Sequence, residues 1–366
     1  MNRDFEKITI IGLGLMGGSL GAALVRKGFR VRGWDNDPEA INEAYRMGAI
    51  SEVSESFEAV VRDAGVIFIA TPVAFISDTI KRCLPYITLE VIFSDMGSIK
   101  EQIITEVFSF LPQTCYFVPG HPMTGSERHG ITAADPFLFE NAAYIIIEDE
   151  RTPMKAISRI KEILATTGAH LMNLKAAEHD RIVGIVSHLP HLIAATLSRT
   201  AGVEEGNFPG TLNLAAGGFR DTTRVAMGSP KLWEEIINGN RDKILRAIHL
   251  FEMELGNLKH NIINDDLQGL LLFLNEARET RAQIPAKNKG FLSLLHEMVV
   301  TIEDKPGTIE AVLRFLSKAN INIKDIEILR IREGDGGTLR LALEDDHSVG
   351  EAIKILKAEG FKAWRR

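Results

Sequence analysis

The feature that most constrains the fold is a glycine-rich turn near the N-terminus. A β-branched run, Ile8 to Ile11, is followed by Gly12, Gly14 and Gly17 in G-x-G-x-x-G spacing and then by an apolar helical pattern. Glycines at these positions allow a tight turn, close approach of the backbone to a pyrophosphate, and close packing of the helix on its strand. The segment therefore predicts a strand, a turn and a helix whose N-terminus faces the phosphates of a dinucleotide.

An acidic residue follows at the distance that this motif requires. Asp35 ends the second β-branched run, where a carboxylate can accept hydrogen bonds from ribose hydroxyls and repel a 2′-phosphate. The pattern favours NAD over NADP, with helix capping ahead of Pro38 as the alternative interpretation of Asp35. The residues expected to bind the cofactor are Gly12, Leu13, Gly14, Leu15, Met16, Gly17, Asp35, Thr71 and Pro72.

Strands and helices alternate through the first part of the chain. Short β-branched runs separated by helical patterns predict a parallel sheet wrapped by helices. We expect six strands, at Ile8 to Ile11, Arg30 to Trp34, Val66 to Ala70, Val91 to Asp95, Tyr116 to Pro119 and Tyr144 to Ile147. This order is typical of an α/β doubly wound Rossmann domain, which we expect over residues 1–168.

Two more domains are expected after this one. Long apolar-periodic stretches at Ala176 to Thr200 and Lys231 to Ala282 predict an all-helical domain over residues 169–290. Its apolar residues lie on more than one side of the helices, which favours a homodimer over a monomer with an internal core. Over residues 295–366, the order strand, helix, strand, strand, helix, strand predicts a ferredoxin-like βαββαβ module.

Composition narrows the class of function. A formal charge of −7 argues against nucleic-acid binding, which needs a clustered cationic surface. The two cysteines, Cys83 and Cys115, lie in apolar stretches, which argues against a disulfide framework and fits a reducing compartment. The first residues do not resemble a secretory signal, and no apolar run approaches the roughly 18 residues of a membrane span. We therefore expect a cytoplasmic protein with no membrane partner.

Two polar segments follow the fourth and fifth expected strands, at the carboxyl edge where open α/β sheets bind ligands. Ser94 to Lys100 reads SDMGSIK, and Pro119 to Glu127 reads PGHPMTGSE. A histidine held between glycine and proline on such a loop suits proton transfer, because its unperturbed pKa is about 6.5. We therefore expect His121 to take part in catalysis.

Further polar clusters lie in the helical region. Glu178 to Arg181 reads EHDR, and Ser187 to His191 reads SHLPH, with two histidines three positions apart and so on roughly one face. The paired histidines predict a substrate or metal site, with buried core histidines as the alternative. Gly217 to Arg224 reads GGFRDTTR, and its two arginines can bind carboxylates bidentately, with a solvated interhelical loop as the alternative.

Together these motifs resemble the prephenate dehydrogenase family of tyrosine biosynthesis, also called the TyrA family. The resemblance rests on GLGLMGGSL, SDMGSIK, GHPMTGSE, SHLPH and GFRDTTR in this order, and it covers about residues 6–285. It implies an NAD-binding domain, a helical dimerisation domain, and oxidative decarboxylation of prephenate to 4-hydroxyphenylpyruvate. The C-terminal module, with DKPGT between its first strand and helix, resembles an ACT domain, a regulatory fold that often senses amino acids.

The resemblance also implies roles for individual residues. His121 takes up the proton of the ring hydroxyl as hydride departs to NAD, and Ser98 orients that pair. Arg224 binds a substrate carboxylate, and His191, more than His188, contacts the substrate. The remaining residues implied for the pocket and its gate are Gly217, Asp221, Trp233 and Glu127. No metal is required, because the cofactor supplies the redox chemistry.

The C-terminal module also suggests a ligand site. Lys305 to Thr308 forms a short turn before a helix, whose free N-terminal amides suit the carboxylate of an amino acid. The expected effector is the end product tyrosine, and the residues expected to bind it are Pro306, Gly307 and Asn322. A module that only assists folding or oligomerisation is the alternative.

Three other functions stay open at this point. An arogenate dehydrogenase would perform the same chemistry on a side chain with an amino group in place of the keto group. A β-hydroxyacid dehydrogenase has a similar two-domain plan but lacks GHPMTGSE followed by SHLPH. A non-catalytic sensor of amino acids or redox state would not need intact His121 and Arg224.

Overall fold

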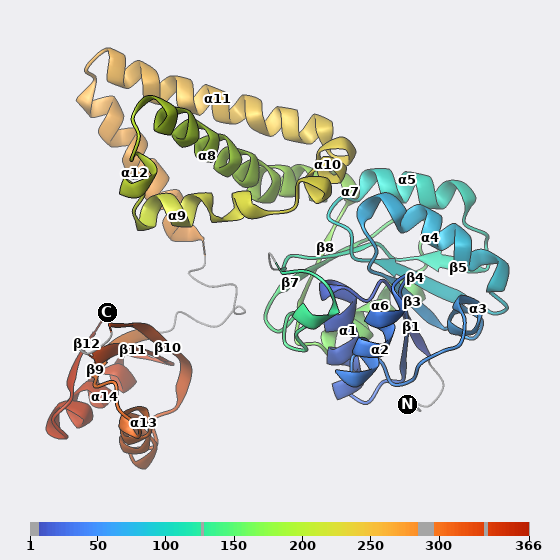
Figure 1. The fold of residues 1–366 in the computed structure, drawn as a ribbon, viewed down its shortest axis with the longest axis horizontal. Helices are drawn as coiled ribbons and strands as arrows, with labels where there is room; N and C mark the ends of the chain where they lie inside the picture. Colours follow the sequence, from blue (N-terminus) through green and yellow to red (C-terminus); the bar gives the residue numbers. More distant parts are fainter. Residues whose placement is uncertain (1–6, 126–127, 285–295, 333–335, 366) are drawn as a thin grey trace. The chain divides into compact units, whose positions relative to one another are not determined.

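The computed structural model describes residues 7–125, 128–284, 296–332 and 336–365. The chain divides into two compact units, Met1–Gly290 and Phe291–Arg366. The first unit contains a parallel sheet wrapped by helices, a small second sheet and a group of long helices, and the second unit is an antiparallel sheet with two helices (Figure 1). The predicted fold class, a Rossmann domain followed by a helical domain and a ferredoxin-like domain, is confirmed.

The main sheet consists of five parallel strands in the order β2-β1-β3-β4-β5. The strands are buried on both faces, so their sequences are nearly continuous apolar runs. Their bounds are β1 Ile8–Ile11, β2 Val31–Trp34, β3 Val66–Ile69, β4 Val91–Asp95 and β5 Cys115–Phe117. The chain goes from β1 to β2 on one side and then crosses to β3 on the other. The turn after β1 therefore lies at the point where ligands of open α/β sheets bind.

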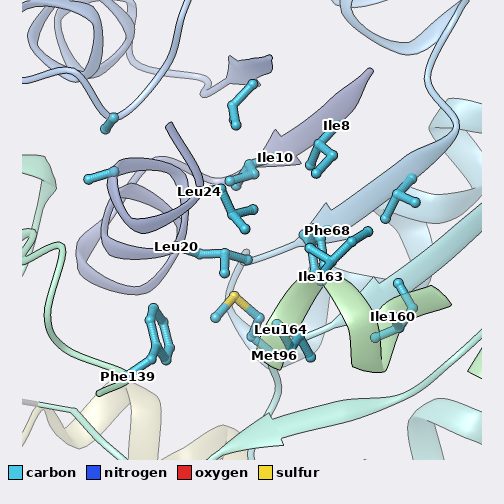
Figure 2. Packing of buried hydrophobic residues seen from close by; sticks show 14 of the residues in the cluster. Ile8, Ile10, Leu20, Leu24, Phe68, Met96, Phe139, Ile160, Ile163 and Leu164 are labelled. Carbon is cyan, nitrogen blue, oxygen red and sulfur yellow. The ribbon is translucent and has the colours of Figure 1, made fainter. Parts of the chain in front are cut away.

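Two apolar clusters cover the opposite faces of this sheet, because successive strand residues point to opposite sides. One lies under α1 (Leu15–Arg26), α2 (Pro38–Arg46) and α6 (Met154–Ala165), and the other under α3 (Phe57–Val61), α4 (Ile76–Cys83) and α5 (Glu101–Phe110). Burial of each large side chain contributes roughly 1.5–3 kcal/mol. Figure 2 shows the first cluster, which includes Ile8, Ile10, Leu20, Leu24, Phe68, Ile160, Ile163 and Leu164. Both cysteines are free and buried in the second cluster.

A separate three-stranded sheet corrects part of the strand prediction. The strand predicted at Tyr144 was expected in the main sheet, but β7 (Ala143–Ile147) pairs instead with β6 (Gly120–Pro122) and β8 (His170–Leu174). Neither β6 nor β8 was predicted. β6 consists of glycine, histidine and proline, which are typical of loops, and β8 is only partly buried, so its apolar pattern is weak.

The helical region begins with one long, interrupted helix. α7 (Ala176–Val183) continues through a π-helical turn, Gly184–His188, into α8 (Leu189–Asn207), which begins next to Pro190. By length and composition the segment Ala176–Asn207 passes as a membrane span, a test that packed helices of other proteins also pass. The segment expected at Lys231 to Ala282 is divided into three helices, α10 (Pro230–Gly239), α11 (Arg241–Ile263) and α12 (Leu267–Gln283). α8 and α11 lie side by side (Figure 1).

One interpretation of this region was wrong. The segment GGFRDTTR was expected as a polar cluster between helices, but the structure makes it helical. α9 (Gly217–Thr223) is followed directly by a 3₁₀ turn at Arg224–Met227. The threonine hydroxyls of α9 bind carbonyls one turn back along the same helix, which satisfies them without a loop.

The C-terminal unit has the predicted βαββαβ order. Its antiparallel sheet has the strand order β10-β11-β9-β12, and two helices supply the apolar residues that cover one face of it. The bounds are β9 His296–Ile302, α13 Thr308–Lys318, β10 Ile323–Arg332, β11 Gly336–Leu343, α14 Asp346–Ala358 and β12 Lys362–Arg365.

A buried cation joins three strands of this sheet. Arg340 of β11 is 1% exposed, and its guanidinium donates to Glu297 of β9 at 2.6 Å and to Asp325 and Glu327 of β10 at 2.5 and 2.8 Å. Three carboxylates held this close repel each other, and the guanidinium between them offsets that repulsion. The ion network therefore ties the edge strand β10 to the centre of the sheet.

We predict that Arg340→Met destabilises the C-terminal unit by about 2–4 kcal/mol, because it keeps the volume but removes the cation that three carboxylates share. Hydrogen exchange of β9 and β11 amides in the full chain measures the effect. The matched control is Arg314→Met, which removes an exposed helical ion pair with Glu310 and a distant contact with the Phe315 ring, and it should cost under about 0.5 kcal/mol. Equal protection in the two variants would contradict the prediction.

Candidate active site

The glycine turn after β1 has the geometry of a phosphate-binding loop. Gly12 has φ +95°, and a Cβ there would lie 2.6 Å from the Ala70 carbonyl oxygen. A Cβ on Gly17 would lie 1.9 Å from the Gly12 carbonyl oxygen, whereas one on Gly14 would meet nothing within 4 Å. Two glycines therefore serve packing within the protein, and Gly14 leaves open space where a ligand can approach. No side chain caps the N-terminus of α1, which leaves its amides to an anion.

Asp35 lies at the end of β2, against this turn. Its carboxylate accepts hydrogen bonds from the backbone amides of Leu13 at 2.7 Å and Asp37 at 3.0 Å. The residue that caps α2 is Asp37, whose side chain accepts from the Glu39 amide. The capping interpretation of Asp35 was therefore wrong, and its carboxylate sits beside the turn as a ribose-binding acid requires.

Thr71 and Pro72 follow β3 at the same edge of the sheet. The hydroxyl of Thr71 is buried and has no hydrogen-bond partner among the described residues, and Pro72 is exposed. Ser98 follows β4, and its hydroxyl is likewise buried without a partner in the part of the chain that the structure describes. Each hydroxyl is therefore free to form a hydrogen bond with a bound ligand.

His121 lies on the short strand β6 rather than on a loop, and it is 9% exposed. Its Nδ1 is 2.7 Å from Nε2 of His179, and Nδ1 of His179 is 2.7 Å from Oδ1 of Asp180. The residue bonded to His121 in the structure is His179, which the sequence analysis did not assign to the site. The sequence contained the signal, because EHDR places histidine next to aspartate, yet nothing in it indicated a contact with a residue 58 positions away.

A buried ion pair holds the two segments that carry Ser98 and His121. Nζ of Lys100 pairs with the carboxylate of Asp95 and donates to the carbonyl of Gly120 at 2.7 Å. Asp95 also accepts from the amides of Gly97 at 2.8 Å and Gly120 at 3.3 Å. Lys100 and Asp95 are both fully buried, so each depends on the other for its charge. Gly120, the residue before His121, is thus fixed to the end of β4.

Asp180 extends this network into the helical region. Its carboxylate accepts from the amides of Lys100 and Glu101, both at 2.8 Å, and so caps the N-terminus of α5 from a distant segment. Nδ2 of Asn240 donates to the Asp180 carbonyl at 2.8 Å and lies 3.2 Å from Nδ1 of His188. Residues from the sheet, α7 and the α10–α11 junction therefore form one polar cluster.

The electrostatics of the cluster keep its histidines neutral. Burial lowers the pKa of His121 well below its usual range, and the nearby His179, Lys100 and His188 lower it further. Burial also lowers the pKa of His188 to about 4. A histidine with a lowered pKa is unprotonated at neutral pH, so His121 can accept a proton.

The paired histidines meet an aromatic ring. His191 stacks on Trp233 with ring centroids 3.6 Å apart, and His188 meets the same ring edge-on at 6.0 Å. The expectation that the two histidines share a face is confirmed by this contact. Nε2 of His188 is buried and has no partner among the described residues. No group of three or more His, Cys, Asp or Glu side chains within those residues is arranged to hold a metal ion.

Three other predicted substrate residues lie on α9 and the 3₁₀ turn that follows it. Arg224 begins the 3₁₀ turn next to Val225, whose backbone is hydrogen-bonded to His191. Gly217 and Asp221 are exposed on α9. Glu127 lies outside the described residues.

The expected effector residues lie in the other unit. Gly307 has φ +89° and precedes the first residue of α13, so a left-handed turn opens that helix as the sequence indicated. The hydroxyl of Thr308 donates to the carbonyl of Lys305 at 3.0 Å, and Pro306 lies within the same turn. Asn322 is exposed immediately before β10.

Family models match three consecutive parts of the chain. Residues 20–173 match the nucleotide-binding domain of prephenate dehydrogenase, and residues 175–276 match the dimerisation domain of the same enzyme. Residues 296–361 match the ACT domain.

Individual relatives match over most of the chain. Prephenate dehydrogenase of Bacillus subtilis (strain 168) is 33% identical over 361 residues, which are 98% of this chain and 97% of that protein. The crystal structure of A. aeolicus prephenate dehydrogenase in complex with hydroxyphenyl propionate and NAD+ has a TM-score of 0.70 and 28% identity, covering 78% of this chain and all of that one. The crystal structure of Synechocystis arogenate dehydrogenase has a TM-score of 0.67 and 28% identity, covering 76% of this chain and 100% of that one.

We predict opposite effects for two alanine substitutions in the glycine turn. Gly17→Ala should lower the stability of the ligand-free protein by about 1–3 kcal/mol, because its Cβ overlaps the backbone of Gly12. Gly14→Ala should leave that stability unchanged and weaken dinucleotide binding at least about tenfold, because its Cβ occupies space left for the phosphates. Thermal unfolding and calorimetric titration with NAD measure the two quantities. Destabilisation by Gly14→Ala would contradict the assignment of this space to a ligand.

Proposed function

The chain belongs to the prephenate dehydrogenase family, and we propose that it catalyses the NAD-dependent oxidative decarboxylation of prephenate to 4-hydroxyphenylpyruvate, a step of tyrosine biosynthesis. The observation that carries the proposal is the buried, neutral His121 at the carboxyl edge of a sheet whose glycine turn is built for a dinucleotide. A proton acceptor beside a hydride acceptor is what oxidation of an alcohol requires.

The chain's own residues bind, orient and deprotonate the substrate. His121 accepts the proton of the ring hydroxyl at Nε2, since its Nδ1 is occupied by His179. NAD, when bound, supplies the hydride acceptor for the carbon that bears the hydroxyl. The bond between the ring and its carboxylate breaks, carbon dioxide leaves, and its electron pair completes the aromatic ring. That electron pair leaves the ring oxygen as a phenolate, which takes the proton back from His121 to give 4-hydroxyphenylpyruvate. The substrate therefore loses only the hydride and carbon dioxide.

Cationic and aromatic groups suit the rest of the substrate. We assign a carboxylate of prephenate to Arg224, whose planar guanidinium binds carboxylates bidentately. His191, held flat against Trp233, offers a ring nitrogen, and the buried Nε2 of His188 has no other partner among the described residues. Ser98 offers its free hydroxyl to the hydroxyl of the substrate. Gly217, Asp221 and Glu127 remain proposed members of the pocket and its gate.

The cofactor is proposed to be NAD rather than NADP. Asp35 places a carboxylate at the end of β2 beside the turn, where it would accept from the ribose hydroxyls and repel a 2′-phosphate. Arogenate is the second substrate to test, because one solved relative is named an arogenate dehydrogenase. The two substrates differ only in a keto or amino group on the side chain.

A homodimer is the proposed assembly. Helices α11 and α12 expose many large apolar side chains, including Leu250, Phe251, Leu255, Ile263, Leu267, Leu271 and Leu272. A soluble monomer seldom exposes apolar surface on this scale. These helices lie within or next to the region that matches the dimerisation domain. We propose a soluble cytoplasmic enzyme in which a second copy covers this surface.

We predict that His121 and Arg224 affect different kinetic constants. Incubation with prephenate, arogenate, NAD and NADP in all four pairs, followed by cofactor absorbance, should give the fastest reduction with prephenate and NAD. His121→Asn should lower kcat by about 10²–10⁴-fold with little change in NAD affinity. Arg224→Ala should chiefly raise KM for prephenate, by about 10- to 100-fold, because a charged hydrogen bond is lost. Near-normal kcat without His121 would refute its role, and no turnover of either substrate would refute the proposed function.

We predict that tyrosine inhibits the enzyme through the C-terminal unit. The amides at the start of α13, opened by Gly307, suit the carboxylate of an amino acid, and Asn322 offers an amide. Coupling of about 1–3 kcal/mol between the two sites would be ordinary. Tyrosine is titrated against the full chain, against Asn322→Ala, and against a chain ending at Ile284. Identical inhibition in all three would mean that tyrosine acts by competing at the active site.

A further inference from the structure

We infer that His179 and Asp180 are positioning residues that fix the tautomer of His121, so that its Nε2 is left as the proton acceptor. This inference rests on the proposed function, because it concerns how His121 performs its part in the reaction. The three side chains form one chain of hydrogen bonds, from His121 through His179 to Asp180, with both links at 2.7 Å. All three are at most 9% exposed, so no solvent competes for these bonds.

The direction of this hydrogen-bond chain is set at Asp180. Its carboxylate accepts from the amides of Lys100 and Glu101, which are obligate donors, and these bonds stabilise the anion. An ionised carboxylate has no proton to donate, so the contact with His179 requires a hydrogen on Nδ1 of that histidine. The two amides belong to the N-terminus of α5, whose dipole also favours a negative charge at this point.

The same logic carries the constraint to His121. A neutral His179 with hydrogen on Nδ1 has a lone pair on Nε2, so Nε2 can only accept. The 2.7 Å contact then requires Nδ1 of His121 to donate, which leaves Nε2 of His121 with the lone pair. The opposite tautomer would put hydrogen on Nε2 and make His121 unable to take the substrate's proton.

The arrangement also stabilises the product of proton transfer. When His121 gains a proton at Nε2, its Nδ1–H continues to donate to His179, and no second proton needs to move. The negative charge of Asp180 then lies two links from the new imidazolium and favours it. The titratable groups that act on His121 directly are His179, Lys100 and His188, and Asp180 and Asp95 act in turn on His179. Asp180 is thus a source of negative charge connected to His121 through hydrogen bonds.

The test is to reverse the direction of the chain by Asp180→Asn. Oδ1 of Asp180 faces Nδ1 of His179 and accepts from the Lys100 amide, and Oδ2 accepts from the Glu101 amide. An amide with its NH₂ in the Oδ1 position keeps the Glu101 bond through its oxygen and donates to His179. His179 would then accept at Nδ1 and donate from Nε2, and His121 would hold hydrogen on Nε2. We expect kcat to fall by at least about 10²-fold, since a wrongly protonated histidine costs about 10⁴-fold in the serine-protease triad. KM for prephenate should stay within about threefold.

The pH profile supplies a readout that a merely structural role would not move. A negative charge raises the pKa of a nearby histidine, so its removal lowers that pKa. The acidic limb of kcat/KM in Asp180→Asn should therefore lie at lower pH than in the unmodified protein. An unmoved limb with kcat within threefold of normal would overturn the inference.

Two substitutions at His179 keep the inference testable if Asp180→Asn fails to fold. His179→Gln can accept from His121 with its oxygen and donate to Asp180 with its nitrogen, so it should keep kcat within about tenfold. His179→Leu fills a similar volume without either bond and should lose at least about 10²-fold. Thr167→Ala, which removes a buried hydroxyl bonded to the Leu164 carbonyl, is the control for loss of stability alone and should retain kcat. Equal kcat in the Gln and Leu variants would overturn the inference.

Nitrogen NMR of ¹⁵N-histidine-labelled full-length protein tests the tautomer without any turnover. We expect His121 and His179 both to carry hydrogen on Nδ1 and none on Nε2 at neutral pH. Hydrogen on Nε2 of His121 would overturn the inference even if the enzyme is active. Failure of the proposed function is distinguishable, because it would appear as absent prephenate oxidation in the unmodified protein while the tautomer measurement still stands.

Discussion

The site depends on one buried cation, Lys100, which joins three segments that are distant in sequence. Its Nζ binds the Asp95 carboxylate and the Gly120 carbonyl, and its own amide binds Asp180. Removing one partner of a buried ion pair costs about 3–5 kcal/mol, because the other charge stays buried without compensation. Burial lowers the pKa of Lys100, and Asp95 opposes that change. The strand that carries His121 and the helix that carries His179 are therefore both held at the end of β4. The ion pair and hydrogen bonds that hold them join different segments of the chain.

This arrangement resolves a conflict between two requirements of the chemistry. Binding a dicarboxylate such as prephenate favours positive charge, whereas accepting a proton requires a neutral base. The structure separates the two by burial. His121 and His188 are buried and have lowered pKa values, while the guanidinium residue Arg224 is exposed. One protein can therefore hold an exposed guanidinium and buried neutral imidazoles at the same time.

The helical region contributes to the polar cluster around His121, in addition to matching a dimerisation domain. Asp180 caps α5 of the Rossmann domain, and Asn240 binds the Asp180 carbonyl. His188 reaches this cluster from a π-helical turn, a feature that often occurs at functional positions because it shifts side chains relative to a regular helix. A long helix interrupted at this turn places His179 and His188 toward the sheet and His191 against Trp233.

Local patterns in the sequence determined the glycine turn, the place of Asp35 at the end of β2 and the role expected of His121. They also determined the order of strands and helices along the chain in the parallel sheet and in the C-terminal unit. Turn chemistry and side-chain periodicity act over a few residues, so they are legible without a structure. Tertiary structure alone decided that His121 lies on a strand, that β7 leaves the main sheet, and that His179 is bonded to His121. Those outcomes depend on contacts between residues 58 and 80 positions apart, which arise only when the chain path brings buried donors and acceptors together, because burial makes an unpaired polar group costly.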